Sequence, residues 1–249
     1  DFGSHAVGMR TRAVRRDGSW ILNGTKRWIT NGSLSKVAVV WAQTEEGVRG
    51  FLVEPGMPGY ETRDIKGKFS LRGSVTSELF FNDVEVPESS RLPKAEGMKG
   101  PLSCLTQARF GISWGVLGAA MACFDEVVEY SKERIVAGGP LATKQLTHSK
   151  LADMVTEITK GQLLALHLGR LKDQGKLEHP MVSMAKRNNV DIALQVARVS
   201  RDLLGANGIV DDYQSMRHMV NLETVRTYEG THDIHTLVLG EAVTGMRAI

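Results

Sequence analysis

"PLSCLTQARFGISWGVLGAAMACFDEVVEYSKERI", residues 101–135, is where the pattern of the chain changes. From this stretch onward, apolar residues recur at the three- and four-residue spacing of amphipathic helices, as in the stripe of Leu151, Met154 and Ile158. Consecutive long helices with short connections favour an antiparallel bundle. We therefore predict a helical bundle over residues 96–249, with no strand beyond residue 105.

Glycine- and proline-rich breaks divide this helical half. They lie at residues 138–140, 173–180 and 205–208. This spacing predicts about three long helices before the segment "TYEG" and one after it.

The first part of the chain is typical of β structure. β-prone runs alternate with turn signals, of which Asn23-Gly24 and Asn31-Gly32 are the strongest because Asn-Gly is favoured in tight hairpins. A run at 77–87 indicates a further strand, and the charged, proline-containing segment 88–101 is typical of a linker. We predict an α+β fold, with a β-barrel-like domain over residues 1–95 and the helical bundle after it.

Composition excludes several classes of protein. The net charge of +3 comes from 31 basic and 28 acidic residues that are mixed along the chain, so we expect no nucleic-acid partner. No apolar run approaches the roughly 20 residues of a membrane-spanning helix, so we expect no membrane span. Cys104 and Cys123 would lie about 28 Å apart on one helix, too far to pair. Two unpaired cysteines fit a reducing compartment.

The segment "TYEGTHDIH", residues 227–235, carries the most suggestive chemistry. His232 and His235 are three residues apart and could share one helix face as metal ligands, but no third ligand is evident. A polar helix start is the simpler interpretation, and we predict no metal. In "LLGANG" the helix precedes the glycines, which excludes a dinucleotide-binding fingerprint and favours a helix stop.

Ten segments taken together resemble the acyl-CoA dehydrogenase family, and within it the glutaryl-CoA dehydrogenases. They are "NGTKRWITNG", "GFLVEPGMPG", "GKFSLRGS", "VEVPE", "ARFGISWGVLGA", "LADMVTEIT", "LGRLKDQGK", "MVSMAKRNN", "ARVSRDLLGANGI" and "TYEGTHDIH". The last is the most specific, because "YEGT" suits the family broadly and "THDIH" is similar to the glutaryl branch. The family's middle β domain and C-terminal helical domain agree with the two halves inferred from the pattern.

The resemblance implies an FAD enzyme that removes hydrogens from the α and β carbons of a short-chain acyl-CoA. It is expected to be glutaryl-CoA, with decarboxylation to crotonyl-CoA. Glu229 corresponds to the catalytic base, whose pKa burial would raise toward that of a proton acceptor. In the family, the thioester oxygen is held by the backbone N–H of this glutamate and by a flavin hydroxyl.

The resemblance also assigns binding residues. The expected FAD contacts are Trp28, Ile29, Thr30, Arg134, Gln145, Asp202, Leu203, Leu204, Gly205, Ala206 and Thr231. The expected acyl-CoA contacts are Ser4, Leu102, Thr106, Arg109 and Gly230. Arg109 would meet the CoA phosphates. Arg134, Gln145 and residues 202–206 would reach the FAD of a neighbouring subunit, so a homotetramer is expected.

Several features depart from the family pattern. Val136 and Ala137 stand where an aromatic residue and Gln are usual, Ala206 replaces a Gly, and Glu241 replaces an Arg. FAD is therefore expected to bind less tightly than in relatives. The family's N-terminal helical domain has no counterpart here, so the chain corresponds to the two C-terminal domains, and the arginine expected to bind the distal carboxylate of glutaryl-CoA is outside it.

Three functions stay open at this point. The first is the dehydrogenase, with an electron-transferring flavoprotein as electron acceptor, in the cytoplasm of a bacterium or the mitochondrial matrix of a eukaryote. The second is a short-chain acyl-CoA oxidase that uses dioxygen. The third is a non-catalytic oligomerisation or scaffold module that has lost FAD. Flavin absorbance would exclude the third, and the choice between dioxygen and the flavoprotein would separate the first two.

Overall fold

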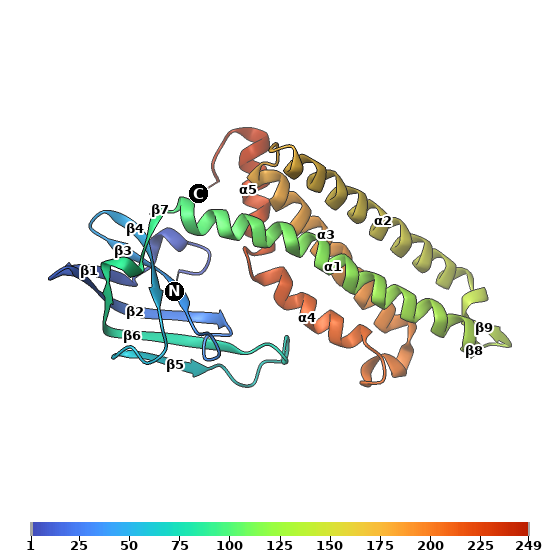
Figure 1. Cartoon of the computed structure of the whole chain (residues 1–249). Helices are drawn as coiled ribbons and strands as arrows, with labels where there is room; N and C mark the ends of the chain where they lie inside the picture. Colours follow the sequence, from blue (N-terminus) through green and yellow to red (C-terminus); the bar gives the residue numbers. More distant parts are fainter. Residues whose placement is uncertain (1, 249) are drawn as a thin grey trace. The chain divides into compact units, whose positions relative to one another are not determined.

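A computed structural model describes residues 2–248 of the chain (Figure 1). It divides into two compact units, Asp1–Cys104 and Leu105–Ile249. The first unit is built on a β-sheet and the second on α-helices, which confirms the predicted α+β class.

The β unit contains a seven-stranded sheet with strand order β5-β6-β2-β1-β3-β4-β7. The strands are β1 (Arg12–Arg16), β2 (Ser19–Thr30), β3 (Ala38–Thr44), β4 (Gly47–Val53), β5 (Tyr60–Asp64), β6 (Thr76–Pro87) and β7 (Arg91–Glu96), and a 3₁₀ turn, η1 (Ala6–Gly8), precedes them. Neighbouring strands are antiparallel except β1 and β3. In the described residues β5 and β7 form the two edges, so the sheet is an open version of the predicted barrel.

The core of the β unit follows from period-two alternation. Along β6 the buried side chains include Leu79, Phe81, Val84 and Val86, while the residues between them are more exposed. Trp20 on β2 and Phe51 on β4 meet in the same core with ring centroids 5.4 Å apart.

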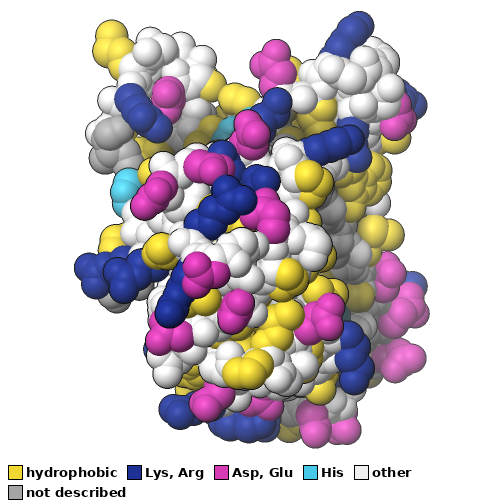
Figure 2. Space-filling model, turned by 60° about the vertical axis from the view of Figure 1, so that its left-hand side comes forward, with side chains coloured by type: hydrophobic (Ala, Val, Ile, Leu, Met, Phe, Trp, Pro, Cys, Tyr) yellow, Lys and Arg dark blue, Asp and Glu magenta, His cyan; other side chains and the backbone are white. Residues whose placement is uncertain are grey.

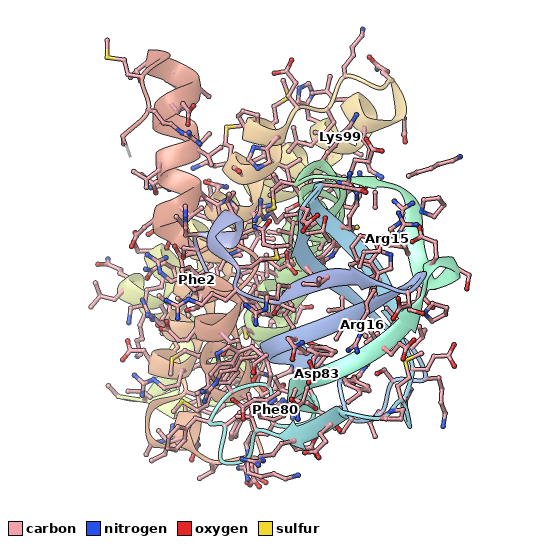
Figure 3. All side chains as sticks on the ribbon, turned by 90° about the vertical axis from the view of Figure 1, so that its left-hand side faces the viewer. Phe2, Arg15, Arg16, Phe80, Asp83 and Lys99 are labelled. Atoms are coloured by element: carbon pink, nitrogen blue, oxygen red, sulfur yellow. The ribbon has the colours of Figure 1, made fainter. Side chains whose placement is uncertain are left out.

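The expected hairpin at Asn23-Gly24 is wrong. Both residues lie inside β2, where the pairing with β6 shifts register between Leu22 and Gly24. A Cβ on Gly24 would lie 2.7 Å from the Thr11 Cα, so glycine is required there by close backbone packing. Asn23 instead donates a side-chain hydrogen bond of 2.8 Å to Asp83 on β6, and Asp83 is labelled in Figure 3.

The turns that join the first strands lie elsewhere. Asp17 (φ 50°) and Gly18 (φ 86°) form the two-residue connection between β1 and β2, as in a type I′ hairpin. Asn31-Gly32 does end β2, but β2 pairs with β1 and β6 and not with the next strand, β3.

The segment predicted as a linker is largely structured. It contains a 3₁₀ turn, η2 (Glu88–Ser90), and strand β7, which pairs with β4. Glu88 holds the turn through a 2.7 Å bond from Trp20 Nε1 and a 2.6 Å bond from Arg91 Nε. These contacts extend the sheet to residue 96.

The helical unit confirms three long helices before the "TYEG" segment and one after it. The helices are α1 (Lys99–Glu133), α2 (Gln145–Asp173), α3 (His179–Leu203), α4 (Ser215–Thr227) and α5 (His232–Thr244), with 3₁₀ turns η3 (Leu141–Thr143) and η4 (Gly205–Ile209). The shorter helix α4 was not predicted. Its only buried residues are Ser215, Leu222 and Val225, too few to give a clear apolar stripe.

α3 lies at the centre of the unit and packs against α2, α4 and α5 (Figure 1). The core joins Val116, Ala120 and Cys123 of α1 to Ile158 of α2 and Ala193 of α3. The helical period therefore gives the right architecture.

A minimal hairpin contradicts the expectation of no strand beyond residue 105. β8 (Ile135–Val136) pairs with β9 (Gly139–Pro140) across Ala137 and Gly138. Both turn residues have positive φ, 48° and 78°. The glycine-rich break before α2 is thus a two-residue hairpin turn.

Helix α1 needs a correction to the membrane prediction. By length and composition alone it could cross a membrane, with a mean hydropathy of 1.3 in its most apolar window. Of that window 33% is buried within the protein, and Val116, Leu117, Ala120, Cys123 and Val127 are among the buried residues of the helix. A core helix of a helical domain passes the same test.

Candidate active site

Glu229 lies in the short loop between α4 and α5. It has φ 54° and is followed by Gly230 with φ 86°, so two successive residues adopt the left-handed conformation. This conformation is costly for a residue with a Cβ and persists only where surrounding contacts enforce it. Thr231 then caps α5, because its hydroxyl accepts a 3.2 Å hydrogen bond from the Ile234 N–H.

Three buried side chains bind the main chain of this loop. Arg109 Nε on α1 donates to the Glu229 carbonyl at 2.8 Å, and His235 Nε2 on α5 lies 3.1 Å from the same oxygen. Lys186 Nζ on α3 donates to the carbonyls of Val225, Tyr228 and Gly230 at 2.8, 3.0 and 2.9 Å. We call Arg109, Lys186 and His235 the carbonyl clamp.

The surroundings of the Glu229 carboxyl are those of a proton acceptor. The side chain is half-buried, and Oε2 is fully buried without a hydrogen-bond partner. Burial raises the pKa of Glu229, while the positive charges of Arg109 and Lys186 oppose that rise. An unpartnered carboxylate with a raised pKa is the state required of a general base.

The structure gives Arg109 a different immediate role from the predicted one. Its side chain is buried, and besides the Glu229 carbonyl it contacts His179 Nε2 at 3.3 Å through Nη1. Burial and the neighbouring guanidinium lower the pKa of His179, so the imidazole is the acceptor in this contact. The phosphate contact stays a prediction that this buried placement does not favour.

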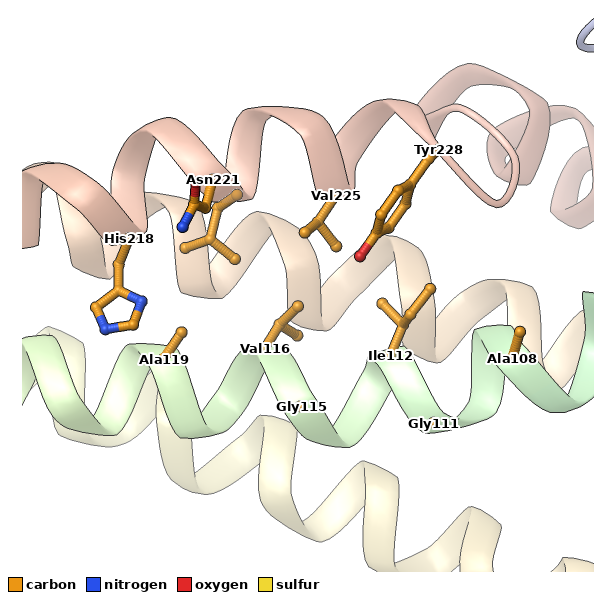
Figure 4. A pocket seen from close by; sticks show the side chains of 11 residues that line it. Ala108, Gly111, Ile112, Gly115, Val116, Ala119, His218, Asn221, Val225 and Tyr228 are labelled. Atoms are coloured by element: carbon orange, nitrogen blue, oxygen red, sulfur yellow. The ribbon is translucent and has the colours of Figure 1, made fainter. Parts of the chain in front are cut away.

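A pocket of about 430 Å³ begins next to the loop and runs between α1 and α4 (Figure 4). Tyr228, the neighbour of Glu229, points into one end, and His218 lies at the other. The α1 wall consists of small and apolar residues, including Gly111, Ile112 and Gly115. An apolar pocket of this size suits a small organic group.

The predicted substrate residues divide between the two units. Gly230 and Arg109 belong to the Glu229 site itself, and a Cβ on Gly230 would lie 2.8 Å from His235 Nε2. Thr106 lies one turn before Arg109 on α1, and Leu102 is exposed one further turn away. Ser4 is exposed in the β unit, ahead of η1.

A second group of predicted residues gathers at the other end of the helical unit. Arg134 follows α1, Gln145 begins α2, and residues 202–206 end α3 and enter η4. Two contacts link these elements: Lys150 and Asp202 form a 2.8 Å ion pair, and Tyr130 Oη donates to the Leu204 carbonyl at 3.3 Å. Along α1 this end lies about 37 Å from Arg109 at 1.5 Å per residue.

The predicted flavin-ring residues lie at the end of β2. Trp28 has φ 62° and is 60% exposed, and the β2–β6 pairing shifts register between Lys26 and Ile29. Thr30 is exposed at the last position of the strand. A bulge that turns a large aromatic residue outward is a common device at binding sites. Thr231, the remaining expected flavin contact, is the cap of α5 described above.

A charged patch or a group of metal-ligating side chains would be an alternative kind of site. On the face shown in Figure 2, Lys and Arg side chains are mixed with Asp and Glu side chains. Within residues 2–248 no group of three His, Cys, Asp or Glu side chains could hold a metal ion. His235 belongs to the carbonyl clamp, and His232 is half-buried at the start of α5.

Sequence reasoning missed Lys186, His179 and the role of His235. A signal for Lys186 was available, because it lies four residues from both Val182 and Val190 on the buried face of α3. A lysine at such a position is buried only when its charge is satisfied. His179 and His235 lacked any comparable signal, since their partners come from distant parts of the chain.

Two family models cover the chain. "Acyl-CoA dehydrogenase, middle domain" matches residues 1–84, and "Acyl-CoA dehydrogenase, C-terminal domain" matches residues 95–244. With this sheet, this helical unit and the Glu229 loop, the chain belongs to the acyl-CoA dehydrogenase family.

Individual relatives show which members of the family the chain resembles. An acyl-CoA dehydrogenase of Bacillus subtilis is 33% identical over 98% of this chain and 66% of its own length. The crystal structure of glutaryl-CoA dehydrogenase from Mycobacterium smegmatis is 53% identical with a TM-score of 0.99, over 100% of this chain and 64% of that one, and a second structure of it contains FADH2. Butyryl-CoA dehydrogenase from Megasphaera elsdenii is 33% identical with a TM-score of 0.91, over 97% of this chain and 65% of that one. The chain thus spans just under two thirds of these proteins.

Proposed function

We propose that the protein containing this chain catalyses FAD-dependent α,β-dehydrogenation of a short-chain acyl-CoA, with glutaryl-CoA as substrate and Glu229 as the catalytic base. The observation that carries the proposal is the buried, unpartnered Oε2 of Glu229, whose neighbour in the chain, Tyr228, lines an apolar pocket. The identity of 53% to a glutaryl-CoA dehydrogenase supports the substrate. The butyryl-CoA relative, at 33%, makes an unbranched short acyl-CoA the alternative substrate.

In this mechanism the Glu229 carboxylate takes the α-proton of the thioester. FAD, when bound, supplies the acceptor for the β-hydrogen as a hydride. The main chain of Glu229 faces the developing enolate, because its N–H is the expected donor to the thioester oxygen. With glutaryl-CoA, the carboxylic acid then returns its proton to the γ carbon after CO2 leaves, so one residue serves both steps.

The residues of this chain fit the cofactor. In the β unit the exposed Trp28 and Thr30 would lie along the flavin ring, and in the helical unit Thr231 is a further expected flavin contact. The M. smegmatis relative that contains FADH2 supports FAD as the cofactor. The presence of Val136 and Ala137 in place of the usual aromatic residue and Gln is expected to weaken the adenine contact. Reintroducing a phenylalanine would not test this cleanly, because Ala137 has φ 48° and a bulky residue is strained there.

Assembly belongs to the same proposal. Arg134, Gln145 and residues 202–206 lie about 37 Å along the bundle from the Glu229 site, so they would hold the FAD phosphates and adenine of a second copy. Leu146 and Leu163 on α2 are 80% and 61% exposed, which is typical of a face that another subunit covers. We expect a homotetramer with residues 1–95 and 96–249 as its domains, an electron-transferring flavoprotein as its partner, and a cytoplasmic or mitochondrial-matrix location.

The test is Glu229→Gln in the intact protein. This change keeps the shape and removes the proton acceptor, so FAD and acyl-CoA should still bind while flavin reduction slows by about 10²- to 10⁴-fold. Rapid-mixing absorbance at the flavin band, with glutaryl-CoA and butyryl-CoA compared, measures this rate. Glu241→Gln, at an exposed carboxylate on α5, is the matched control. If the Glu229 variant reduces its flavin at the parental rate, Glu229 has only a structural role.

One further comparison separates the dehydrogenase from the oxidase. After reduction by substrate, the flavin of a dehydrogenase should be reoxidised faster by an electron-transferring flavoprotein than by dioxygen. Faster reoxidation by dioxygen would favour the oxidase, and a protein purified without flavin absorbance would favour the scaffold.

A further inference from the structure

Lys186 is a buried cation whose hydrogen bonds all go to the loop that carries the base. Its side chain is 1% exposed, and an ammonium group has three N–H donors. The three carbonyls that accept them lie at 2.8, 3.0 and 2.9 Å, at the end of α4 and on both sides of Glu229. No donor of the ammonium is left over, so these three bonds account for its burial.

The loop needs such a constraint. Glu229 and Gly230 both have positive φ, and the left-handed conformation costs a non-glycine residue roughly 1–2 kcal/mol. Lys186 binds the carbonyls before and after Glu229, while Arg109 and His235 bind the carbonyl of Glu229 itself. The strained conformation is therefore fixed from both sides, with Lys186 as the only described residue that spans it.

The charge of Lys186 also acts on the base. The charged or titratable groups that interact with this ammonium are Arg109 on α1, Arg226 on α4, His235 on α5 and Glu229 in the loop. Burial lowers the pKa of Lys186 to about 8, and the ammonium is still the main form at neutral pH. Its positive charge favours the ionised form of Glu229.

We propose that Lys186 is a positioning residue for catalysis, which holds Glu229 in its strained conformation through three carbonyl bonds and keeps it ionised through its charge. The proposal rests on the proposed function, because it takes Glu229 as the base. It predicts two separable effects of removing the ammonium. The chemical step should be slower because the carboxylate is displaced, and the rate of that step should rise at a different pH.

The experiment compares Lys186→Met with Lys186→Arg in the intact, FAD-loaded protein, by the pH dependence of flavin reduction. Methionine fills a similar volume without charge or donors. The rate of flavin reduction should fall by about 10²-fold, the typical cost of misplacing a reacting group by 1 Å. The rate rises with pH as the base ionises, so loss of the positive charge should move this rise to higher pH by about one unit. Lys186→Arg keeps the charge but not the three-bond geometry, so it should slow the step without moving the rise.

Asn189→Ala is the matched control. Asn189 is buried on the same helix and donates to the Ser113 and Gly161 carbonyls, away from the loop. Its loss should destabilise the fold and leave the pH dependence in place. If Lys186→Met does not fold, Lys186→Gln, which retains polar donors without charge, should show the same shift.

Two results would overturn the proposal: a pH dependence in the uncharged variant that coincides with the parent, or an unchanged rate at all pH values. Glu229→Gln in the same assay separates this failure from failure of the proposed function. A slow Glu229→Gln beside an unaffected Lys186→Met would reject the role of Lys186 alone. A fast Glu229→Gln would reject the base itself.

Discussion

Because of His235, the stability of the helical unit should fall as the pH falls. One substitution at this position should remove that contribution. The imidazole is 0% exposed, its Nε2 lies 3.1 Å from the Glu229 carbonyl, and Nδ1 is buried without a hydrogen-bond partner. Burial, with help from the charges of Lys186 and Arg109, lowers the pKa of His235 from 6.5 to about 4. The folded protein therefore holds this histidine neutral, with Nε2 as the donor.

The sign and size of the effect follow from that shift. In the unfolded chain the histidine takes up a proton near pH 6.5, while in the folded chain it does so only near pH 4. Its contribution is thus fully present above pH 6.5 and is lost as pH falls toward 4, with a limit of about 3 kcal/mol. Between pH 7 and pH 5 the loss amounts to about 2 kcal/mol of the free energy of unfolding.

His235→Gln isolates this contribution, because an amide can donate to the same carbonyl and does not titrate. Urea unfolding at pH 7 and pH 5, followed by circular dichroism, should show a smaller pH dependence in the variant by about 2 kcal/mol. The partly buried His179, His218 and His232 also have lowered pKa values and act in the same direction, so the difference between the two proteins is the quantity to measure. His148→Gln, at an exposed site on α2, should leave the parental dependence in place. Parallel pH dependences in the parent and His235→Gln would refute the reasoning.

Two further predictions concern glycine and thiol chemistry. Gly230→Ala places a Cβ 2.8 Å from His235 Nε2 at φ 86°, so we expect a loss of about 2 kcal/mol or more in urea unfolding and a collapse of the flavin-reduction rate, and parental values would show that the loop can relax. Burial raises the pKa of the Cys123 thiol to about 11 whereas Cys104 is exposed, so a maleimide should label one thiol per folded chain, and rapid labelling of both would contradict the burial of Cys123.

Long helical periodicity in the sequence predicted the helices correctly where it was strong. The apolar helix predicted from residue 102 is one continuous helix over Lys99–Glu133, and the three breaks that follow it divide the helices correctly. Helix α4 was not predicted because it buries few residues. The structure of segment 88–96 was not predicted because its strand is short and contains a proline. Both depend on packing partners far away in the sequence.

Turn signals were less reliable than helical periodicity. A sequence such as Asn-Gly indicates that a glycine is needed, but it does not say whether a turn or close packing requires it. Asn23-Gly24 has the sequence of a hairpin turn, but Gly24 is needed for its closeness to Thr11, which only the folded sheet brings there. Hairpins whose two turn residues both have positive φ form instead at Asp17-Gly18 and Ala137-Gly138, where this conformation serves a tight connection.

The candidate site shows the same difference between residues that lie within one motif and residues that folding brings together from distant parts of the chain. Glu229 could be proposed as the base from its motif alone, because the motif and the backbone conformation around it lie within a few residues. The clamp could not, because Arg109, Lys186 and His235 come from three helices and converge only on folding.

The clamp fits the proposed role of Glu229 as a base that lies beside two cations. An ion pair with Arg109 or Lys186 would lower the proton affinity of Glu229 and leave it a poor acceptor for a proton from carbon. Here the hydrogen bonds of both cations go to main-chain carbonyls and to His179, and Glu229 Oε2 has no hydrogen-bond partner. The cations therefore act on the carboxylate through space and oppose the rise in the pKa of Glu229 that burial causes, without a hydrogen bond to Oε2. Any variant that turns one of these donors from a carbonyl toward the carboxylate should cost more activity than stability.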